Sequence, residues 1–372
     1  MNGLYLGLMS GTSLDGVDAA LVELGPERCE LLAAATTPYP DSLRARVRTL
    51  IEDRRAPLEG LGSLDVALGR FFAECALGLI QRSGRERGEI VAIGHSGHTV
   101  CHKPASPDPF TMQLGDANVV AACTGITTVA DFRGMDVALG GQGAPLVPAF
   151  HRWRFATPGE VRVIINIGGI ANLTRLHPRD PLVGFDSGPG NALMDGWCRR
   201  CKGEPFDRGG DWARSGKIDA ALLERFRADA YFARRPPKST GVEHFDMAWI
   251  ERGLGAMDEP VADEDVQATL LELTASSIAD AVITVSPDIE RAVICGGGAQ
   301  NEALVARLSR LLPAASVDSS AAHGIEPDWV EAVAFAWLAR ARLRREPGNV
   351  PTVTGARQGA VLGALYSSGG VD

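Results

Sequence analysis

The residue types best suited to chemistry first occur in a short polar turn near the N-terminus. Apolar runs at 4–8 and 17–24 flank this turn, a pattern typical of a β-hairpin. Glycines permit positive φ and close backbone approach, so N–H groups of such a loop can converge on an anion. The acid of such a loop can hold Mg²⁺ beside phosphates. An ordinary surface hairpin explains the same residues: Gly11, Thr12, Ser13, Leu14, Asp15 and Gly16.

A second hairpin of the same design occurs in the middle of the chain. An apolar run at 161–167 enters the turn Gly168–Gly169, with Asn166 just ahead of it, and a second run leaves at 170–174. Two copies predict a duplicated architecture, in which two domains each offer a phosphate-facing hairpin to a shared cleft. Coincidence is the alternative, because Gly-Gly is a common turn between strands.

Two other segments place polar groups or glycines directly after apolar runs. In 183–191, the glycines and proline around Asp186 predict a loop that is neither helix nor strand, followed by a helix from about Ala192. Further on, a strand at 291–295 runs into Gly296, Gly297 and Gly298. Such a turn lets the backbone lie flat against a ring system or a sugar, although it also occurs for packing alone.

The last predicted helix, from about Pro327 to Arg345, has a strongly apolar face that includes one carboxylate, Glu331. Taken alone, this residue is more simply interpreted as an exposed or edge acid than as a ligand. The glycines and prolines of 140–148 are typical of a hinge or domain crossing. Helical spacing predicts further helices at 40–50, 61–82 and 266–286.

Composition limits the class of protein. A chain of 372 residues with 45% hydrophobic and 22% charged residues is typical of a globular protein of two domains. Its net charge of −9 argues against a general nucleic-acid binder. Neither a signal peptide nor an uncharged apolar segment of membrane-spanning length is evident, and seven cysteines without paired CxxC spacing indicate reduced thiols. We therefore expect a cytoplasmic protein without a membrane partner.

Nine short motifs occur along the chain at 9–18, 109–116, 130–133, 140–148, 166–172, 185–191, 237–241, 295–299 and 331–339. In this order they resemble the anhydro-N-acetylmuramic acid kinase family, a member of the sugar kinase, Hsp70 and actin superfamily. The resemblance implies a two-domain α/β protein of actin/hexokinase-like (ribonuclease H-like) fold, with mixed five-stranded sheets flanking a deep ATP cleft. Domain I would comprise 1–133 plus 352–372, and domain II would comprise 134–351. A homodimer is also implied.

The resemblance implies a role for each motif. Asp186 would be the catalytic base, and the sugar would contact Arg133, Glu331, Gly141 and Gln142. Asp15 would be a ligand of Mg²⁺. The ATP-binding residues would be Gly11, Thr12, Ser13, Leu14, Asp15, Gly16, Val17, Asp18, Asn166, Gly168, Gly169, Gly296, Gly297, Gly298 and Asn301.

The implied reaction converts ATP, water and 1,6-anhydro-N-acetylmuramic acid, a small amino sugar, into N-acetylmuramic acid 6-phosphate and ADP during murein recycling. One carboxylate suffices, because it can activate water at C1 while the γ-phosphoryl group captures O6. A simple hydroxyl sugar kinase of the same superfamily and an ATP-gated chaperone-type binding module are the alternatives. The chain departs from the family pattern at Ser96 and His98, where the family has His and Gln, and at Val242, where it has Arg.

Overall fold

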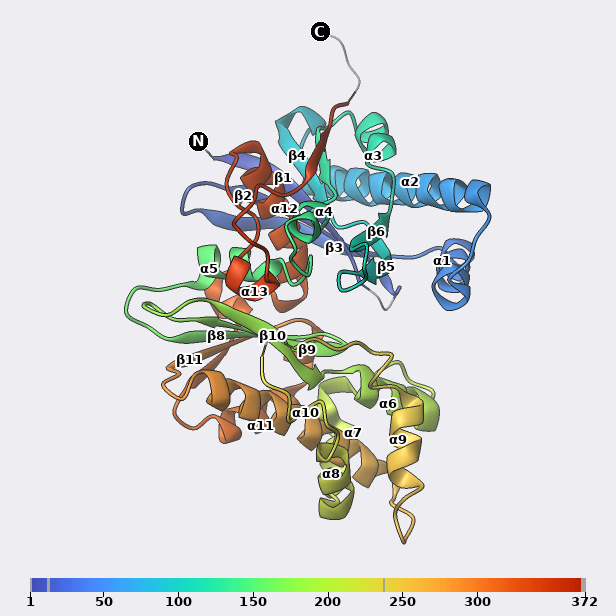
Figure 1. The fold of residues 1–372 in the computed structure, drawn as a ribbon, viewed down its shortest axis with the longest axis vertical. Helices are drawn as coiled ribbons and strands as arrows, with labels where there is room; N and C mark the ends of the chain where they lie inside the picture. Colours follow the sequence, from blue (N-terminus) through green and yellow to red (C-terminus); the bar gives the residue numbers. More distant parts are fainter. Residues whose placement is uncertain (1, 12–13, 237, 369–372) are drawn as a thin grey trace. The chain divides into compact units, whose positions relative to one another are not determined.

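The computed structural model describes residues 2–11, 14–236 and 238–368, and the chain divides into two compact units (Figure 1). Unit 1 takes residues 1–154 and 329–372, and unit 2 takes residues 155–328. This division differs from the predicted one, since the segments 134–154 and 329–351 group with unit 1. Thr12, Ser13 and Pro237, which belong to predicted motifs, lie outside the described residues.

The sheet of unit 1 has the strand order β13-β7-β4-β1-β2-β3. Strands β1, β2 and β3 form an antiparallel meander. On the other side of β1, strand β4 pairs parallel with β1 and β7 pairs parallel with β4, and β13 forms the edge, antiparallel to β7. The strand bounds are β1 Gly3–Ser10, β2 Gly16–Leu24, β3 Cys29–Pro38, β4 Ile90–His95, β7 Thr128–Ala130 and β13 Ala364–Tyr366. A separate hairpin is formed by β5 His98–Lys103 and β6 Phe110–Leu114.

The sheet of unit 2 has the order β10-β9-β8-β11-β12. It too begins with an antiparallel meander, β8 to β10, and continues from β8 with the parallel strands β11 and β12. The bounds are β8 Arg162–Ile167, β9 Ile170–Leu176, β10 Val183–Pro189, β11 Arg291–Cys295 and β12 Ser316–Ser319. In each unit the third strand in sequence thus stands at one edge and the first stands in the middle.

The two sheets therefore share one topology, which confirms the predicted duplication and the actin/hexokinase-like fold class. The predicted number of five strands is correct for the sheet of unit 2, whereas the sheet of unit 1 has six strands because it also contains β13. The first predicted hairpin is β1–β2 and the second is β8–β9, so each occupies the same position in its own sheet. The expected cleft stays a prediction.

Helix α12 (Val330–Leu343) lies directly on the sheet of unit 1 because two strand positions are glycine (Figure 1). A Cβ atom on Gly7 of β1 would lie 1.8 Å from the carbonyl oxygen of Ala332, and one on Gly94 of β4 would lie 2.2 Å from that of Phe335. Strand side chains alternate between faces, so Leu6 and Leu8 join the core beneath helix α2 instead. The sequence predicted this helix but not its attachment to β1 and β4.

The remaining helices of unit 1 are α1 Asp41–Asp53, α2 Leu58–Ser83, α3 Ala117–Thr124, α4 Gly134–Ala138, α5 Val147–Phe155, which ends one residue into unit 2, and α13 Pro351–Thr354. Those of unit 2 are α6 Ala192–Lys202, α7 Asp211–Ser215, α8 Ala220–Arg227, α9 Met247–Leu254, α10 Asp263–Val285 and α11 Glu302–Leu311. Short 3₁₀ turns stand at Gly297–Gln300 and Pro327–Trp329.

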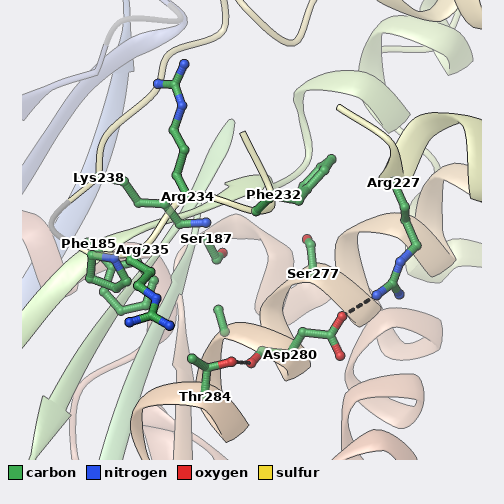
Figure 2. A pocket seen from close by; sticks show the side chains of 13 residues that line it. Phe185, Ser187, Arg227, Phe232, Arg234, Arg235, Lys238, Ser277, Asp280 and Thr284 are labelled. Atoms are coloured by element: carbon green, nitrogen blue, oxygen red, sulfur yellow. Dashed lines mark hydrogen bonds and ion pairs between the residues drawn. The ribbon is translucent and has the colours of Figure 1, made fainter. Parts of the chain in front are cut away.

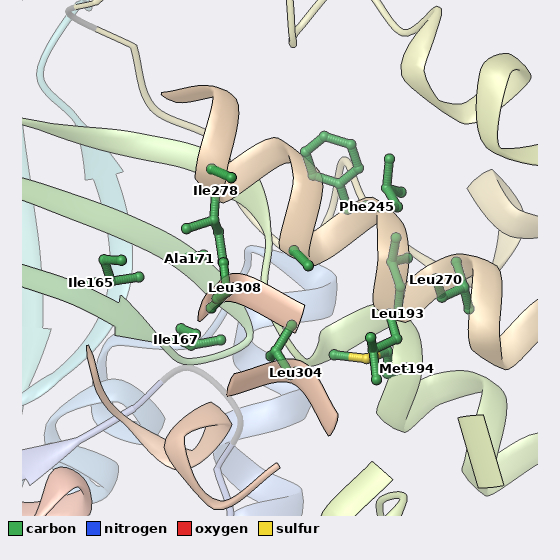
Figure 3. Close-up of a cluster of buried hydrophobic side chains, with 14 of the residues drawn as sticks. Ile165, Ile167, Ala171, Leu193, Met194, Phe245, Leu270, Ile278, Leu304 and Leu308 are labelled. Carbon is green, nitrogen blue, oxygen red and sulfur yellow. The ribbon is translucent and has the colours of Figure 1, made fainter. Parts of the chain in front are cut away.

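Helix α10 is the central helix of unit 2. It is long and apolar enough to cross a membrane by length and composition, but 67% of its apolar window is buried within the protein. Its residues Leu270 and Ile278 join a core that also contains Ile165 and Ile167 of β8 (Figure 3). Burial of this extent is what the core helix of a folded domain requires, and α10 has that role here.

Candidate active site

The first hairpin joins β1 to β2 through a turn that starts after Ser10, whose register partner is Val17. Leu14 adopts a left-handed φ of 58° and is 4% exposed, so it anchors the turn to the core. The Asp15 side chain is exposed, and its carbonyl oxygen accepts the N–H of Tyr39 at 3.4 Å. The turn thus combines a buried anchor with a carboxylate that is open to solvent.

Three of the predicted site residues meet in unit 1. Burial, followed by the charge of Asp18, raises the pKa of Glu331, and the Arg133 guanidinium acts in the opposite direction. Burial lowers the pKa of Arg133, partly offset by Glu331. The charges of Asp18 and Arg133 therefore act in opposite directions on Glu331, in the first turn of α12. Glu331 is not the isolated edge acid that its own segment indicated.

The loop with Gly141 and Gln142 is organised by a buried carboxylate that the sequence analysis did not single out. Asp136, fully buried on α4, accepts the N–H of Gly143 at 2.8 Å and the side chains of Asn349 and Thr354 at 2.6 and 2.7 Å. A Cβ on Gly141 would lie 2.2 Å from this carboxylate, so the loop closes around Asp136 only with glycine there.

The same loop positions the predicted sugar-binding side chains. Arg133 donates from Nη1 to the Gly143 carbonyl at 2.8 Å, and the backbone N–H of Gln142 donates to Thr354 at 2.7 Å. The Gln142 side chain is exposed. His102 of β5, which the sequence analysis did not identify, lies near Arg133. Burial, and then the charge of Arg133, lowers the pKa of His102. The structure therefore brings Arg133, Gln142 and His102 into one neighbourhood.

The unusual residues Ser96 and His98 both contact the end of β1. Ser10 donates its N–H to the Ser96 hydroxyl at 3.1 Å, and its own hydroxyl lies 2.9 Å from His98 Nδ1 and 2.7 Å from the Tyr39 hydroxyl. Burial lowers the pKa of His98 to about 4 and that of the neighbouring His95 to about 4, so both rings are neutral near pH 7. Ser96 and His98 thus support the end of β1, from which the first hairpin turn starts.

In unit 2, the second hairpin and the three-glycine turn are in contact. A Cβ on Gly296, whose φ is 78°, would lie 2.5 Å from Asn166 Oδ1, and one on Gly298 would lie 2.3 Å from the Ile167 side chain. Glycine is therefore required at these positions for the turn to approach the end of β8. The Gly297 Cβ position has more space, with its closest neighbour 3.9 Å away.

Two asparagines near this turn have structural partners. Asn301 caps helix α11 by accepting the N–H of Leu304 at 3.1 Å, which occupies its side-chain oxygen. Asn191 donates from Nδ2 to the Ile167 carbonyl at 3.2 Å. The carbonyls of Gly168 and Gly169 accept N–H groups from residues 190–192. Of the backbone hydrogen bonds found in the described chain, none uses a Gly168 or Gly169 N–H, which leaves both groups for an anion.

Asp186 lies in strand β10, which corrects the predicted loop. Glycine and proline are tolerated there because β10 is an edge strand and the ladder to β9 shifts register between Asp186 and Gly188. The Asp186 N–H donates to the Lys238 carbonyl at 3.1 Å, and the Tyr231 hydroxyl donates to the Asp186 carbonyl at 2.7 Å. Both backbone groups of Asp186 are thus fixed from the segment that follows α8.

The Asp186 carboxylate combines burial with few partners. Burial raises its pKa to about 6, although the Thr240 N–H, which donates to Oδ2 at 3.0 Å, and the charge of Lys238 both act to lower it. A carboxylate with such a pKa is ionised at neutral pH and remains basic enough to accept a proton. This is the ionisation behaviour that a general base needs.

The described residues contain no group of three or more His, Cys, Asp or Glu side chains placed to hold a metal ion. The carboxylate of Asp15, the predicted Mg²⁺ ligand, is exposed. The seven cysteines are all free thiols, Cys198 and Cys201 included.

The family model and the sequence relatives agree on one family. The model of anhydro-N-acetylmuramic acid kinase matches residues 3–368. A protein of that name from Xanthomonas axonopodis pv. citri (strain 306) is 51% identical over 368 residues, which cover 98% of this chain and 98% of the relative. One from Pasteurella multocida (strain Pm70) is 46% identical over 363 residues, which cover 97% of this chain and 96% of the relative. A solved activator of the 2-hydroxyisocaproyl-CoA dehydratase from Clostridium difficile matches 92% of this chain and 96% of its own at 13% identity and a TM-score of 0.48. With a family model that spans almost its whole length and relatives that share about half of its residues, the chain belongs to the anhydro-N-acetylmuramic acid kinase family.

Proposed function

We propose that this chain phosphorylates 1,6-anhydro-N-acetylmuramic acid at O6 with ATP while water opens the anhydro ring. The products are N-acetylmuramic acid 6-phosphate and ADP, which places the reaction in murein recycling. Membership of the kinase family supports the reaction class. The observation that carries the mechanism is the buried carboxyl of Asp186, whose pKa of about 6 suits a general base.

The chemistry requires one proton acceptor. Asp186 takes a proton from the water that forms the new bond to C1, and the C1–O6 bond breaks as that bond forms. O6 receives the γ-phosphoryl group, and ADP leaves with the electrons of the broken P–O bond. The second carboxylic acid of an inverting glycosidase is unnecessary, because phosphorus and not a proton captures the leaving oxygen.

The other residues bind and orient. Arg133 is suited to the lactyl carboxylate of the sugar, since a guanidinium pairs with carboxylates through two parallel hydrogen bonds. Glu331, Gly141 and Gln142 would complete the sugar site. Mg²⁺, when bound beside Asp15, supplies charge neutralisation to the phosphates. The ATP-binding groups would be the two hairpins and the turn Gly296–Gly298.

Replacing the base tests the proposal. Asp186→Asn keeps the size of the side chain but removes the proton acceptor, so turnover should fall by at least about 10²-fold, the usual contribution of a general base, while ATP binding stays close to wild type. Asp258→Asn, at an exposed position of the same unit, is the matched control. Turnover retained in Asp186→Asn would refute the assignment.

Labelled water separates ring opening from simple phosphorylation. In H₂¹⁸O, the proposed reaction places the label at the C1 hydroxyl of the product faster than anomeric exchange does. A product that carries the label only through exchange would indicate a simple hydroxyl kinase. The cytoplasmic location and the homodimer that the sequence predicts belong to the same proposal, and light scattering in solution tests the second.

A further inference from the structure

Unit 2 contains a cavity of about 480 Å³ beside the strand that carries Asp186. It lies between strand β10, helices α8 and α10, and residues 232–236 and 238 (Figure 2). Phe185 and Ser187 line it, whereas Asp186, between them, does not; its carboxylate instead accepts the N–H of Thr240. The cavity is therefore a separate site on the strand that carries Asp186.

The cavity is strongly cationic in a chain that is acidic overall. Four cationic residues line it, Arg227, Arg234, Arg235 and Lys238, against one carboxylate, Asp280, while the whole chain has a net charge of −9. Arg227 is already paired with Asp280. Figure 2 shows Lys238 and Arg235 on one side of the cavity and the Arg227–Asp280 pair on the other.

Three of these cations form no ion pair with another described residue. Within the described part of the chain, no carboxylate lies within ion-pair distance of Arg234, Arg235 or Lys238. The Lys238 ammonium lies 4.6 Å from the centre of the Tyr231 ring, and the Arg234 guanidinium lies 5.7 Å from it. Both cations therefore make cation–π contacts with the same ring. Burial, and then the charge of Arg234, lowers the pKa of Lys238, and the charge of Asp186 acts in the opposite direction. A bound anion would relieve this repulsion.

The polar groups at the inner wall favour the same ligand. The Ser187 hydroxyl donates to the Ala171 carbonyl at 3.2 Å and the Ser277 hydroxyl donates to the Thr274 carbonyl at 3.1 Å, so both protons are committed to the protein. Arg227 is paired with Asp280, and Lys238 Nζ donates one hydrogen bond, to the Tyr231 carbonyl at 3.4 Å. The N–H groups that remain for a ligand are therefore those of Arg234 and Arg235 and the other two of the Lys238 ammonium. A guanidinium can bind a phosphate through two parallel hydrogen bonds and an ammonium binds it as a point charge, so these groups suit a phosphate.

We propose that this cavity is a binding site for a phosphate group, carried by a phosphate monoester or by free phosphate, with Arg235 and Lys238 as its main ligands. The site has a direct connection to Asp186. The Lys238 carbonyl accepts the Asp186 N–H, and Tyr231, on whose ring Lys238 lies, donates its hydroxyl to the Asp186 carbonyl. An occupant would therefore act on the backbone of Asp186. This connection rests on the proposed function, whereas the binding itself does not.

Titration of the full chain with inorganic phosphate and, separately, with N-acetylglucosamine 6-phosphate tests the site, with ³¹P NMR line width and calorimetry as readouts. The double variant Arg235→Gln/Lys238→Gln should bind at least tenfold more weakly, since two charge-assisted contacts are removed. Arg225→Gln is the matched control, because Arg225 is exposed on the same helix as Arg227 but does not line the cavity. Tighter binding of the ester than of phosphate would identify an ester as the occupant, and equal binding would identify free phosphate.

Two results would overturn the proposal. One is equal affinity in the wild type and the double variant, which would place the phosphate elsewhere, for example at the two hairpins. The other is no binding of either probe at millimolar concentration. Asp186→Asn separates this proposal from the proposed function. It should lower turnover by at least about 10²-fold and should not weaken phosphate binding, because it removes a negative charge near Lys238 and leaves the cations in place. Either proposal can therefore fail without the other.

Discussion

Asp136 provides the sharpest test of how unit 1 holds its site. Its carboxylate is fully buried and accepts three hydrogen bonds, two at Oδ1 from Asn349 and Thr354 and one at Oδ2 from the N–H of Gly143. In Asp136→Asn, one amide oxygen can still accept from Asn349 and Thr354. The amide nitrogen must then face the Gly143 N–H, and two donors cannot satisfy each other.

The expected loss of stability follows from this count. A hydrogen bond to a charged group contributes about 1.5–3 kcal/mol net, and an unsatisfied buried N–H costs about 1–3 kcal/mol. If one hydrogen bond to the carboxylate is lost and one buried N–H is left unsatisfied, the free energy of unfolding should fall by about 3 kcal/mol. For a unit of this size, each kcal/mol lowers the melting temperature by about 2–4 °C, so Asp136→Asn should melt about 6–12 °C below the wild type.

The variant should also bind the sugar less well. The Gly143 carbonyl accepts Arg133 Nη1, so a displaced loop misdirects the guanidinium. Differential scanning calorimetry and steady-state kinetics measure the two effects, and KM for the sugar should rise while KM for ATP changes little. Asp108→Asn, in an exposed turn, is the control. A melting temperature within 2 °C of wild type together with an unchanged KM would refute the reasoning.

Three other outcomes are expected. The value of kcat/KM for the sugar should rise with pH to a midpoint near 6, because burial raises the Asp186 pKa to about 6 and only the ionised form accepts a proton; a midpoint near the ordinary value of 3.8 would contradict this. Gly7→Ala should destabilise unit 1 by about 1–3 kcal/mol in thermal unfolding, because its Cβ would overlap the Ala332 carbonyl, whereas Gly62→Ala, with nothing within 4 Å of its Cβ, should be neutral or stabilising. Tyr231→Phe should lower kcat severalfold without weakening ATP binding, because only the contact to the Asp186 carbonyl is removed; an unchanged kcat would count against that contact.

Local pattern was sufficient for much of the fold. The hairpins were visible because apolar runs flank glycine turns, and helix α2 because its buried residues, Leu64, Leu68, Phe71 and Leu79 among them, recur at helical spacing. The family and the phosphotransferase class expected from the ordered motifs are confirmed. The residue-level roles stay predictions, although the structure does bring Arg133, Glu331 and Asp18 together.

What the sequence could not reveal depends on contacts between distant positions. Asp136 accepts hydrogen bonds from Asn349 and Thr354, which lie 213 and 218 positions away in the sequence. No local sequence pattern indicates such a contact. Asp186 was assigned to a loop because its neighbours are turn formers. Their tolerance in a strand follows from the edge position of β10, a property of the assembled sheet.

The shared topology of the two sheets indicates how the duplicated halves have diverged. By strand order, β1 corresponds to β8 and β4 to β11, so the turn after β4 is the counterpart of the turn at Gly296–Gly298. In unit 2 that turn is glycine and approaches Asn166 closely.

In unit 1 the corresponding turn carries side chains. Ser96 and His98 bond to Ser10 at the end of β1, the position that corresponds to the end of β8. Glycine leaves backbone exposed for a ligand to approach, whereas buried side chains with a neutral ring fill that space. The corresponding contact is thus made in two ways: by close backbone approach of glycines to β8 in unit 2, and by side-chain hydrogen bonds to the end of β1 in unit 1. The departures from the family pattern at Ser96 and His98 therefore lie at the start of the first hairpin and outside its turn.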